Sequence, residues 1–190
     1  MITAIDKNTA LVVIDLQKGI VGGDTAHPIK DILTKAADLI DAFHEERLPV
    51  FLVKVDPAAA SGKKIRKDVE PYDLSKIPPE AWEFVDEIKS VPSDIIITKP
   101  GWNAFFGTSL DEELKQRNIT GIVFCGVAAS VGVEGTARAA SELGYNISIA
   151  VDAVTDRTIE AYQHSINKIF PRIAETGTTS DIIVKLADRT

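Results

Sequence analysis

The chain has 190 residues and a formal net charge of −7, and this length is sufficient for one folded domain with a substantial hydrophobic core. The acidic balance argues against a nucleic-acid partner, because there is no basic surplus to neutralise phosphates. No apolar run approaches the roughly 20 residues needed to span a bilayer, and no signal peptide is apparent. We therefore expect a cytoplasmic protein without a membrane partner, with residues 1–190 forming a single domain.

Short apolar runs, rich in Val and Ile, alternate with longer amphipathic stretches. The runs cover residues 10–14, 50–55, 95–97, 122–125 and 147–151. Nearly continuous apolarity over three to six residues is typical of strands that are buried on both faces of a parallel sheet. The alternation predicts an α/β protein with a three-layer α/β/α, doubly wound, Rossmann-like fold and a mainly parallel sheet of about six strands.

Helical spacing of apolar residues predicts the elements between these runs. The expected helices cover 32–43, a segment from Thr108 as N-cap to Leu114, 133–143 ended by Gly144, 159–173, and 180–187. The proline-rich stretch 56–91 is irregular and contains Lys63 and Lys64. Because it is long for a connection in a compact domain, it is interpreted as a functional loop or lid, with a short helix over 82–88.

In open parallel α/β sheets, ligands bind beyond the carboxyl ends of the strands. The first run ends at Asp15, the third at Lys99, and the fourth leads through Gly126 to a helix that begins near Ser130. Taken alone, each has a structural interpretation: a turn former, a solvated lysine or a packing glycine. Since all three lie at the same edge, we predict that a carboxylate, an ammonium group and a helix N-terminus meet there. Such a terminus can bind an anion.

The single cysteine, Cys125, is the last apolar residue of a run that is predicted to be buried. A cysteine in such a strand behaves as a small hydrophobic residue, and burial raises the pKa of its thiol. A catalytic thiol needs an electropositive and partly exposed position. We therefore interpret Cys125 as structural.

Three segments, in chain order, resemble motifs of the isochorismatase-like hydrolases, also called cysteine hydrolases. They are Leu11–Gln17 with its Asp-x-Gln pattern, Lys99–Leu110, and Gly126–Ala140. The resemblance implies a catalytic triad of which Asp15 and Lys99 are two members. The third member is normally a cysteine, and Gly132 occupies its position. The resemblance also implies a cis peptide bond between Val127 and Ala128, and a homo-oligomer.

Gly132 cannot attack a carbonyl group, so the resemblance points away from amide hydrolysis through a thioester. The true isochorismatase branch also has glycine at this position and hydrolyses a vinyl ether, releasing pyruvate. By that resemblance, Asp15 would act as general acid and general base on a small carboxylated substrate, with Lys99 and backbone amides near Gly132 binding negative charge. The segment 134–138 instead resembles the amidohydrolase branches. The alternative is therefore an amidohydrolase-like homologue that has lost its nucleophile and is non-catalytic or only binds a ligand.

Five residues near these motifs are candidates for substrate binding: Gln17, Trp102, Phe105, Val127 and Ala128. Gln17 could instead cap a turn, and Phe105 could instead pack in the core. The stretch after the second run holds no histidine, unlike the metal site of nicotinamidase-type relatives, and the three histidines show no ligand spacing. We expect no catalytic metal, no cofactor and a small-molecule substrate.

Overall fold

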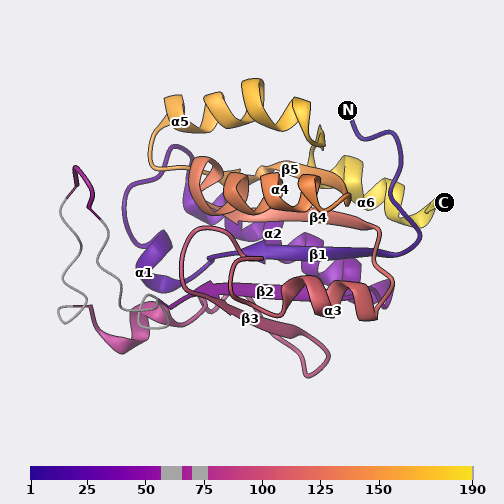
Figure 1. Cartoon of the computed structure of the whole chain (residues 1–190), viewed down its shortest axis with the longest axis horizontal. Helices are drawn as coiled ribbons and strands as arrows, with labels where there is room; N and C mark the ends of the chain where they lie inside the picture. Colours follow the sequence, from indigo (N-terminus) through magenta and orange to yellow (C-terminus); the bar gives the residue numbers. More distant parts are fainter. Residues whose placement is uncertain (57–65, 70–76, 190) are drawn as a thin grey trace.

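The computed structural model describes residues 1–56, 66–69 and 77–189. Its centre is a six-stranded sheet in the order β3-β2-β1-β4-β5-β6, and all neighbouring strands pair in parallel (Figure 1). The strands are β1 Thr9–Ile14, β2 Val50–Val55, β3 Ile95–Lys99, β4 Gly121–Val127, β5 Asn146–Thr155 and β6 Glu175–Gly177. The predicted α/β fold class is confirmed.

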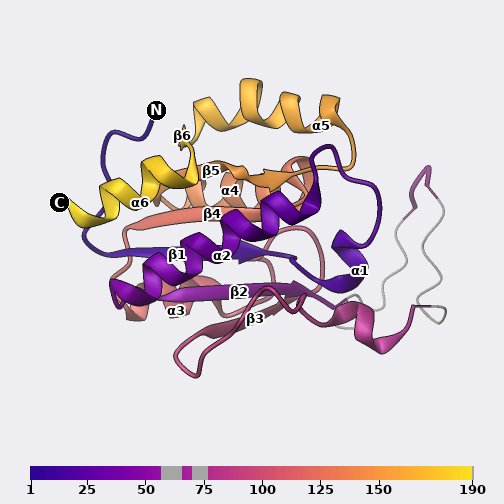
Figure 2. The ribbon, with the colours of Figure 1, turned by 180° about the vertical axis from the view of Figure 1, so that it is seen from behind.

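Helices cover both faces of this sheet. α2 (Ile29–Glu45) and α6 (Thr179–Ala187) pack on one face, which Figure 2 shows from the front. α3 (Leu110–Gln116), α4 (Glu134–Glu142) and α5 (Ile159–His164) lie on the side of the other core. The short α1 (Lys18–Val21) follows β1.

The central strand β1 explains the continuous apolar pattern. Alternate side chains point to opposite faces of a strand, so Leu11 and Val13 enter one core while Ala10, Val12 and Ile14 enter the other. Every residue of β1 is buried. A strand buried on both faces has no position at which a polar side chain can reach water.

Some predicted elements differ from the observed ones. The predicted helix 159–173 is broken into α5, the π-helical η5 (Ser165–Ile169) and the 3₁₀ helix η6 (Phe170–Arg172). Pro171 contributes to this break because it has no N–H to donate to the helix. The predicted helix over 82–88 is wrong, since the helical turn there is the earlier 3₁₀ helix η3 (Pro79–Trp82).

Helix α3 begins one residue later than predicted, with Ser109 as its N-cap. The hydroxyl of Thr108 still accepts a hydrogen bond from the N–H of Leu110. The central part of the predicted loop 56–91, including Lys63 and Lys64, lies outside the described residues. Within the described part of the chain, no helix is both long and apolar enough to cross a membrane.

A close backbone approach joins β1 to β4 at the carboxyl edge. Gly126 pairs with Ile14 and has a φ of +121°, and a Cβ at this position would lie 2.1 Å from the carbonyl oxygen of Ile14. Only glycine fits such a conformation and such a contact. This contact brings the end of β4 directly against the residue that precedes Asp15.

Candidate active site

The side chains of Asp15 and Lys99 meet at the carboxyl edge of the sheet. Lys99 Nζ lies 2.7 Å from Asp15 Oδ2, and their side chains are only 1% and 9% exposed. Lys99 Nζ also donates a hydrogen bond of 2.8 Å to the carbonyl oxygen of Trp102. The predicted carboxylate and ammonium group are therefore in direct contact.

Asp15 has an unusual setting for a carboxyl group. Its backbone has a φ of +53°, in the left-handed region that aspartate tolerates better than most residues. Burial raises the pKa of Asp15 from 3.8 to about 6, although the charge of Lys99 and its hydrogen bond act in the opposite direction. Among the described residues, none donates a hydrogen bond to the buried Oδ1. One oxygen is thus held by Lys99, and the other is available to a substrate or water.

Gly132 lies directly beside this pair. A Cβ on Gly132 would be 2.9 Å from Asp15 Oδ2, 3.0 Å from Cγ2 of Ile14 and 3.4 Å from Lys99 Nζ. The first two distances are shorter than normal non-bonded contacts, so any side chain here would displace the carboxylate. The position that the resemblance gives to a cysteine is therefore next to both charged groups.

A tight turn connects β4 to the helix that carries Gly132. The Val127–Ala128 peptide bond is cis, as expected, and the π-helical η4 (Ala129–Val133) follows and continues into α4. Asp156 is 3% exposed and accepts a 2.7 Å hydrogen bond from the N–H of Ser130. This carboxylate therefore accepts a hydrogen bond from one of the N–H groups that have no partner within the helix at its start.

Thr136 links this helix to the loop that follows β3. Its hydroxyl donates to the carbonyl oxygen of Gly132 over 2.7 Å and accepts from the N–H of Ala104 over 3.1 Å. The two segments that surround the Asp15–Lys99 pair are thereby fixed relative to each other. Our reading of the sequence identified neither Thr136 nor Asp156 as a site residue.

Asp156 was missed because the predicted fifth strand ends too early. The apolar run 147–151 ends before Asp152, whereas β5 continues to Thr155. The rule that selected Asp15 and Lys99 selects Asp156 once the strand end is known. Thr136 offers no comparable signal, because a buried threonine inside a helix has no distinct sequence pattern.

Gln17 does not hydrogen-bond to the carboxylate of Asp15. Its side-chain amide donates to the carbonyl oxygens of Val55 and Trp82, and its Oε1 accepts from the N–H of Val55. Gln17 is fully buried and ties the end of β2 to η3. These bonds match the structural alternative, a residue that fixes the turn after β1.

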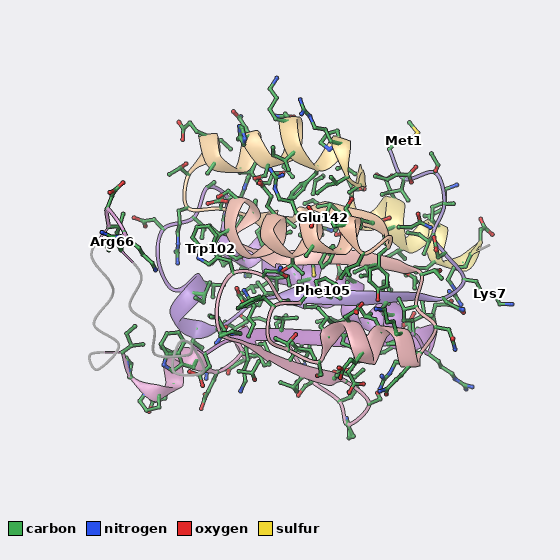
Figure 3. The ribbon with its side chains drawn as sticks, viewed as in Figure 1. Met1, Lys7, Arg66, Trp102, Phe105 and Glu142 are labelled. Carbon is green, nitrogen blue, oxygen red and sulfur yellow. The ribbon has the colours of Figure 1, made fainter. Side chains whose placement is uncertain are left out.

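The two aromatic candidates differ in exposure. Trp102 lies at the carboxyl edge (Figure 3), where it is 68% exposed, and the nearby Phe106 is 72% exposed. Phe105 is half-buried, packs against the core and stacks on Tyr145 with ring centres 6.1 Å apart. Of these two predicted residues, Trp102 is free to contact a ligand, and Phe105 is largely engaged in packing.

Cys125 lies inside β4 with no exposed surface. Burial raises the pKa of its thiol to about 12, so the nucleophilic thiolate is scarce at neutral pH. This matches the structural interpretation from the sequence.

Comparison with known proteins places the fold and the motifs in one family. The model of the isochorismatase domain matches residues 9–181. The isochorismatase family protein YecD of Escherichia coli O157:H7 is 40% identical over 181 residues, which cover 93% of this chain and 95% of that protein. The ureidoacrylate amidohydrolase RutB of Acinetobacter baylyi is more distant, at 28% identity over 171 residues that cover 77% of this chain and 69% of that protein.

A solved structure agrees with these sequence matches. That of an isochorismatase family protein from Burkholderia thailandensis superposes with a TM-score of 0.92 at 36% identity, covering 98% of this chain and 100% of that one. The chain therefore belongs to the isochorismatase family.

Proposed function

We propose that this chain is a hydrolase of a small carboxylated substrate that works without a thiol nucleophile, with Asp15 as general acid and general base. The observation that carries the proposal is the geometry of Gly132. A Cβ there would lie 2.9 Å from Asp15 Oδ2, so glycine lets the carboxyl group lie close to this position and no nucleophilic side chain stands beside it. Hydrolysis of a vinyl ether suits such a site, because it starts with proton transfer and requires no nucleophilic side chain.

A general acid must carry its proton near the pH at which it works. With a pKa of about 6, about a tenth of the Asp15 carboxyl groups are protonated at pH 7. An unburied aspartate would be protonated roughly a hundredfold less often. Burial therefore increases the protonated fraction of Asp15 at neutral pH. The unpartnered Oδ1 is an oxygen that can carry the proton and transfer it to the substrate.

In the proposed reaction, Asp15 donates one proton to the substrate and accepts one proton back from water. Asp15 protonates the terminal carbon of the enol ether, which leaves an oxocarbenium ion at the carbon that bears the ether oxygen. Water adds to that carbon and returns a proton to the Asp15 carboxylate. The resulting hemiketal loses its alcohol and releases an α-keto acid, which is pyruvate when the substrate is isochorismate.

Lys99 has two roles in this scheme. Its contact with Oδ2 fixes the orientation of the carboxyl group, and its charge stabilises the carboxylate that forms when the proton leaves. The hydrogen bond to the carbonyl oxygen of Trp102 holds the ammonium group in place. Trp102 is the aromatic residue that we propose to contact the substrate, whereas Val127 and Ala128 pack in and against the hydrophobic core.

The second candidate is an amidohydrolase-like homologue that has lost its nucleophile. The similarity to RutB of Acinetobacter baylyi favours it, as does the resemblance of segment 134–138 to amidohydrolase branches. A site filled by Trp102 or Phe106 would also favour it, but both side chains are mostly exposed. Binding of isochorismate without pyruvate release would favour this candidate. A homo-oligomer stays a prediction under both.

The first prediction concerns the acid itself. Replacing Asp15 by Asn removes the transferable proton and should lower pyruvate release from isochorismate by about 10²- to 10⁴-fold. Pyruvate is measured with lactate dehydrogenase and NADH. The matched control is Cys125→Ala, which we expect to retain the wild-type rate. Wild-type turnover that survives in Asp15→Asn, or no wild-type turnover at all, would contradict the proposal.

The second prediction concerns pH. Because the protonated form of Asp15 is the active one, kcat/KM should be constant below the pKa of about 6 and should fall about tenfold per pH unit above it. The measurement is the initial rate at low isochorismate concentration between pH 5 and pH 8, with circular dichroism to confirm that the fold is intact. A rate that rises with pH through this range would show that Asp15 acts first as a base.

The third prediction compares two helical glycines. Gly132→Ala should displace the carboxylate of Asp15 and lower both pyruvate release and the free energy of unfolding. Gly135→Ala is the control, since its Cβ would meet only ordinary contacts, the nearest 3.7 Å away at Trp102. Replacing glycine by alanine inside a helix stabilises the helix by up to about 1 kcal/mol. Gly135→Ala should therefore leave the free energy of unfolding, measured by urea denaturation, unchanged or raise it. Equal effects of the two substitutions would refute the steric account.

A further inference from the structure

A cavity lies at the amino-terminal edge of the sheet, at the opposite ends of the strands from Asp15. Its volume is about 390 Å³, within the range of pockets that hold small molecules. The amino ends of β1, β4 and β5 form its floor, and the first residues of the chain and the segment before β6 form its walls. Met1 and Lys7 mark this edge in Figure 3, and Trp102 marks the other one.

The charged groups of this cavity are all acidic. Asp6 and Glu175 line it, and no lysine or arginine does. Within the described part of the chain, neither carboxylate forms an ion pair with a basic side chain. Lys7 belongs to the same edge but extends away from the body of the protein (Figure 3).

Hydrogen bonds orient both carboxylates. Asp6 accepts from the side chains of Asn146 and Thr120, and Glu175 accepts from the N–H and the hydroxyl of Thr3. Partial burial acts to raise the pKa of Glu175, but the bonds from Thr3, with a minor contribution from the terminal amino group, hold it below its ordinary value. At neutral pH the cavity therefore presents negative charge.

A second observation is the hydroxyl group of Ser148. This residue lines the cavity and is 6% exposed, and its side chain makes no hydrogen bond with any other described residue. Among the described residues, the fully buried side-chain atom without a partner is Asp15 Oδ1, so the hydroxyl oxygen of Ser148 is accessible from the cavity. The partner that Ser148 lacks can be supplied by a molecule inside the cavity.

The rest of the lining is apolar. Ile5, Ile122, Ile147 and Ile173 contribute aliphatic surface. Tyr145 contributes its ring, because its hydroxyl is directed to Asp111, to which it donates a hydrogen bond of 2.8 Å. A ligand that matches this lining has a positive charge, a compact apolar body and one polar group that reaches Ser148.

We propose that this cavity is a binding site for a small organic cation of that kind, held by Asp6 and Glu175 at its charged end and by Ser148 at its polar end. The site is separate from the candidate active site. The six residues of β1 lie between them, which corresponds to about 20 Å along the strand. The proposal does not depend on the reaction proposed for Asp15.

The test uses tyramine as the probe and 4-hydroxyphenylacetate as its matched control. The two molecules share the same hydroxyphenyl body and differ in the charge of the end group. Titration of ¹⁵N-labelled protein should show saturable shifts for tyramine, confined to amides around Ser148, Asn146 and Glu175. The carboxylate should produce no saturable shift there.

Variants separate the two recognition elements. The double variant Asp6→Asn/Glu175→Gln should weaken tyramine binding by at least about tenfold, because it removes both charge-assisted contacts. Ser148→Ala should weaken binding by roughly threefold, since it removes one neutral hydrogen bond. Glu112→Gln removes one negative charge from an exposed position of α3 outside the cavity, and it should bind tyramine like the wild type.

Three results would overturn the proposal. They are no saturable shift with tyramine at tens of millimolar, equal binding of both probes, or the same affinity in Ser148→Ala and the double variant as in Glu112→Gln. Ser148→Ala keeps the test valid if the double variant fails to fold. None of these results bears on pyruvate release, so the two proposals fail independently.

Discussion

The contact between Asp15 and Lys99 is the constraint on which the site depends. The two residues follow β1 and end β3, which are not neighbours because β2 lies between them. Lys99 pairs with Val55 at the end of β2, and its long side chain crosses that strand end to reach Asp15. The pair is nearly buried, and removing one partner of a buried pair costs about 3–5 kcal/mol because the other charge is left uncompensated. One ion pair thus links the ends of β1 and β3, with the end of β2 between them.

Two glycines make room for this pair. Gly126 allows β4 to approach the backbone of Ile14, and Gly132 leaves the space next to the carboxyl group empty of side-chain atoms. In a relative with cysteine at the second position, the thiol and the carboxylate would have to share this space. Glycine at this position lets the carboxyl group lie close to the backbone of the helix and to Lys99.

Much of this arrangement could be predicted from the sequence, because strands buried on both faces leave a clear apolar pattern. The ends of β1 and β3 were therefore located closely enough to select Asp15 and Lys99. The prediction of strand ends failed where polar residues lie inside a strand. Because Asp152 and Thr155 are polar, the second half of β5 was not recognised, and Asp156 after it was missed. The three residues Glu175–Gly177 of β6 contain no apolar run at all. The roles of Gln17 and Thr136 depend on backbone groups far away in the sequence, which no local pattern reveals.

The central claim is that burial outweighs Lys99 and leaves Asp15 with a raised pKa. The most direct test is a ¹³C NMR titration of the aspartate carboxyl carbons, with the Asp15 signal assigned by its absence in Asp15→Asn. The account predicts that this signal titrates with a midpoint of about 6. A midpoint at or below the ordinary value of 3.8 would show that Lys99 dominates, and it would contradict a role for Asp15 as the acid.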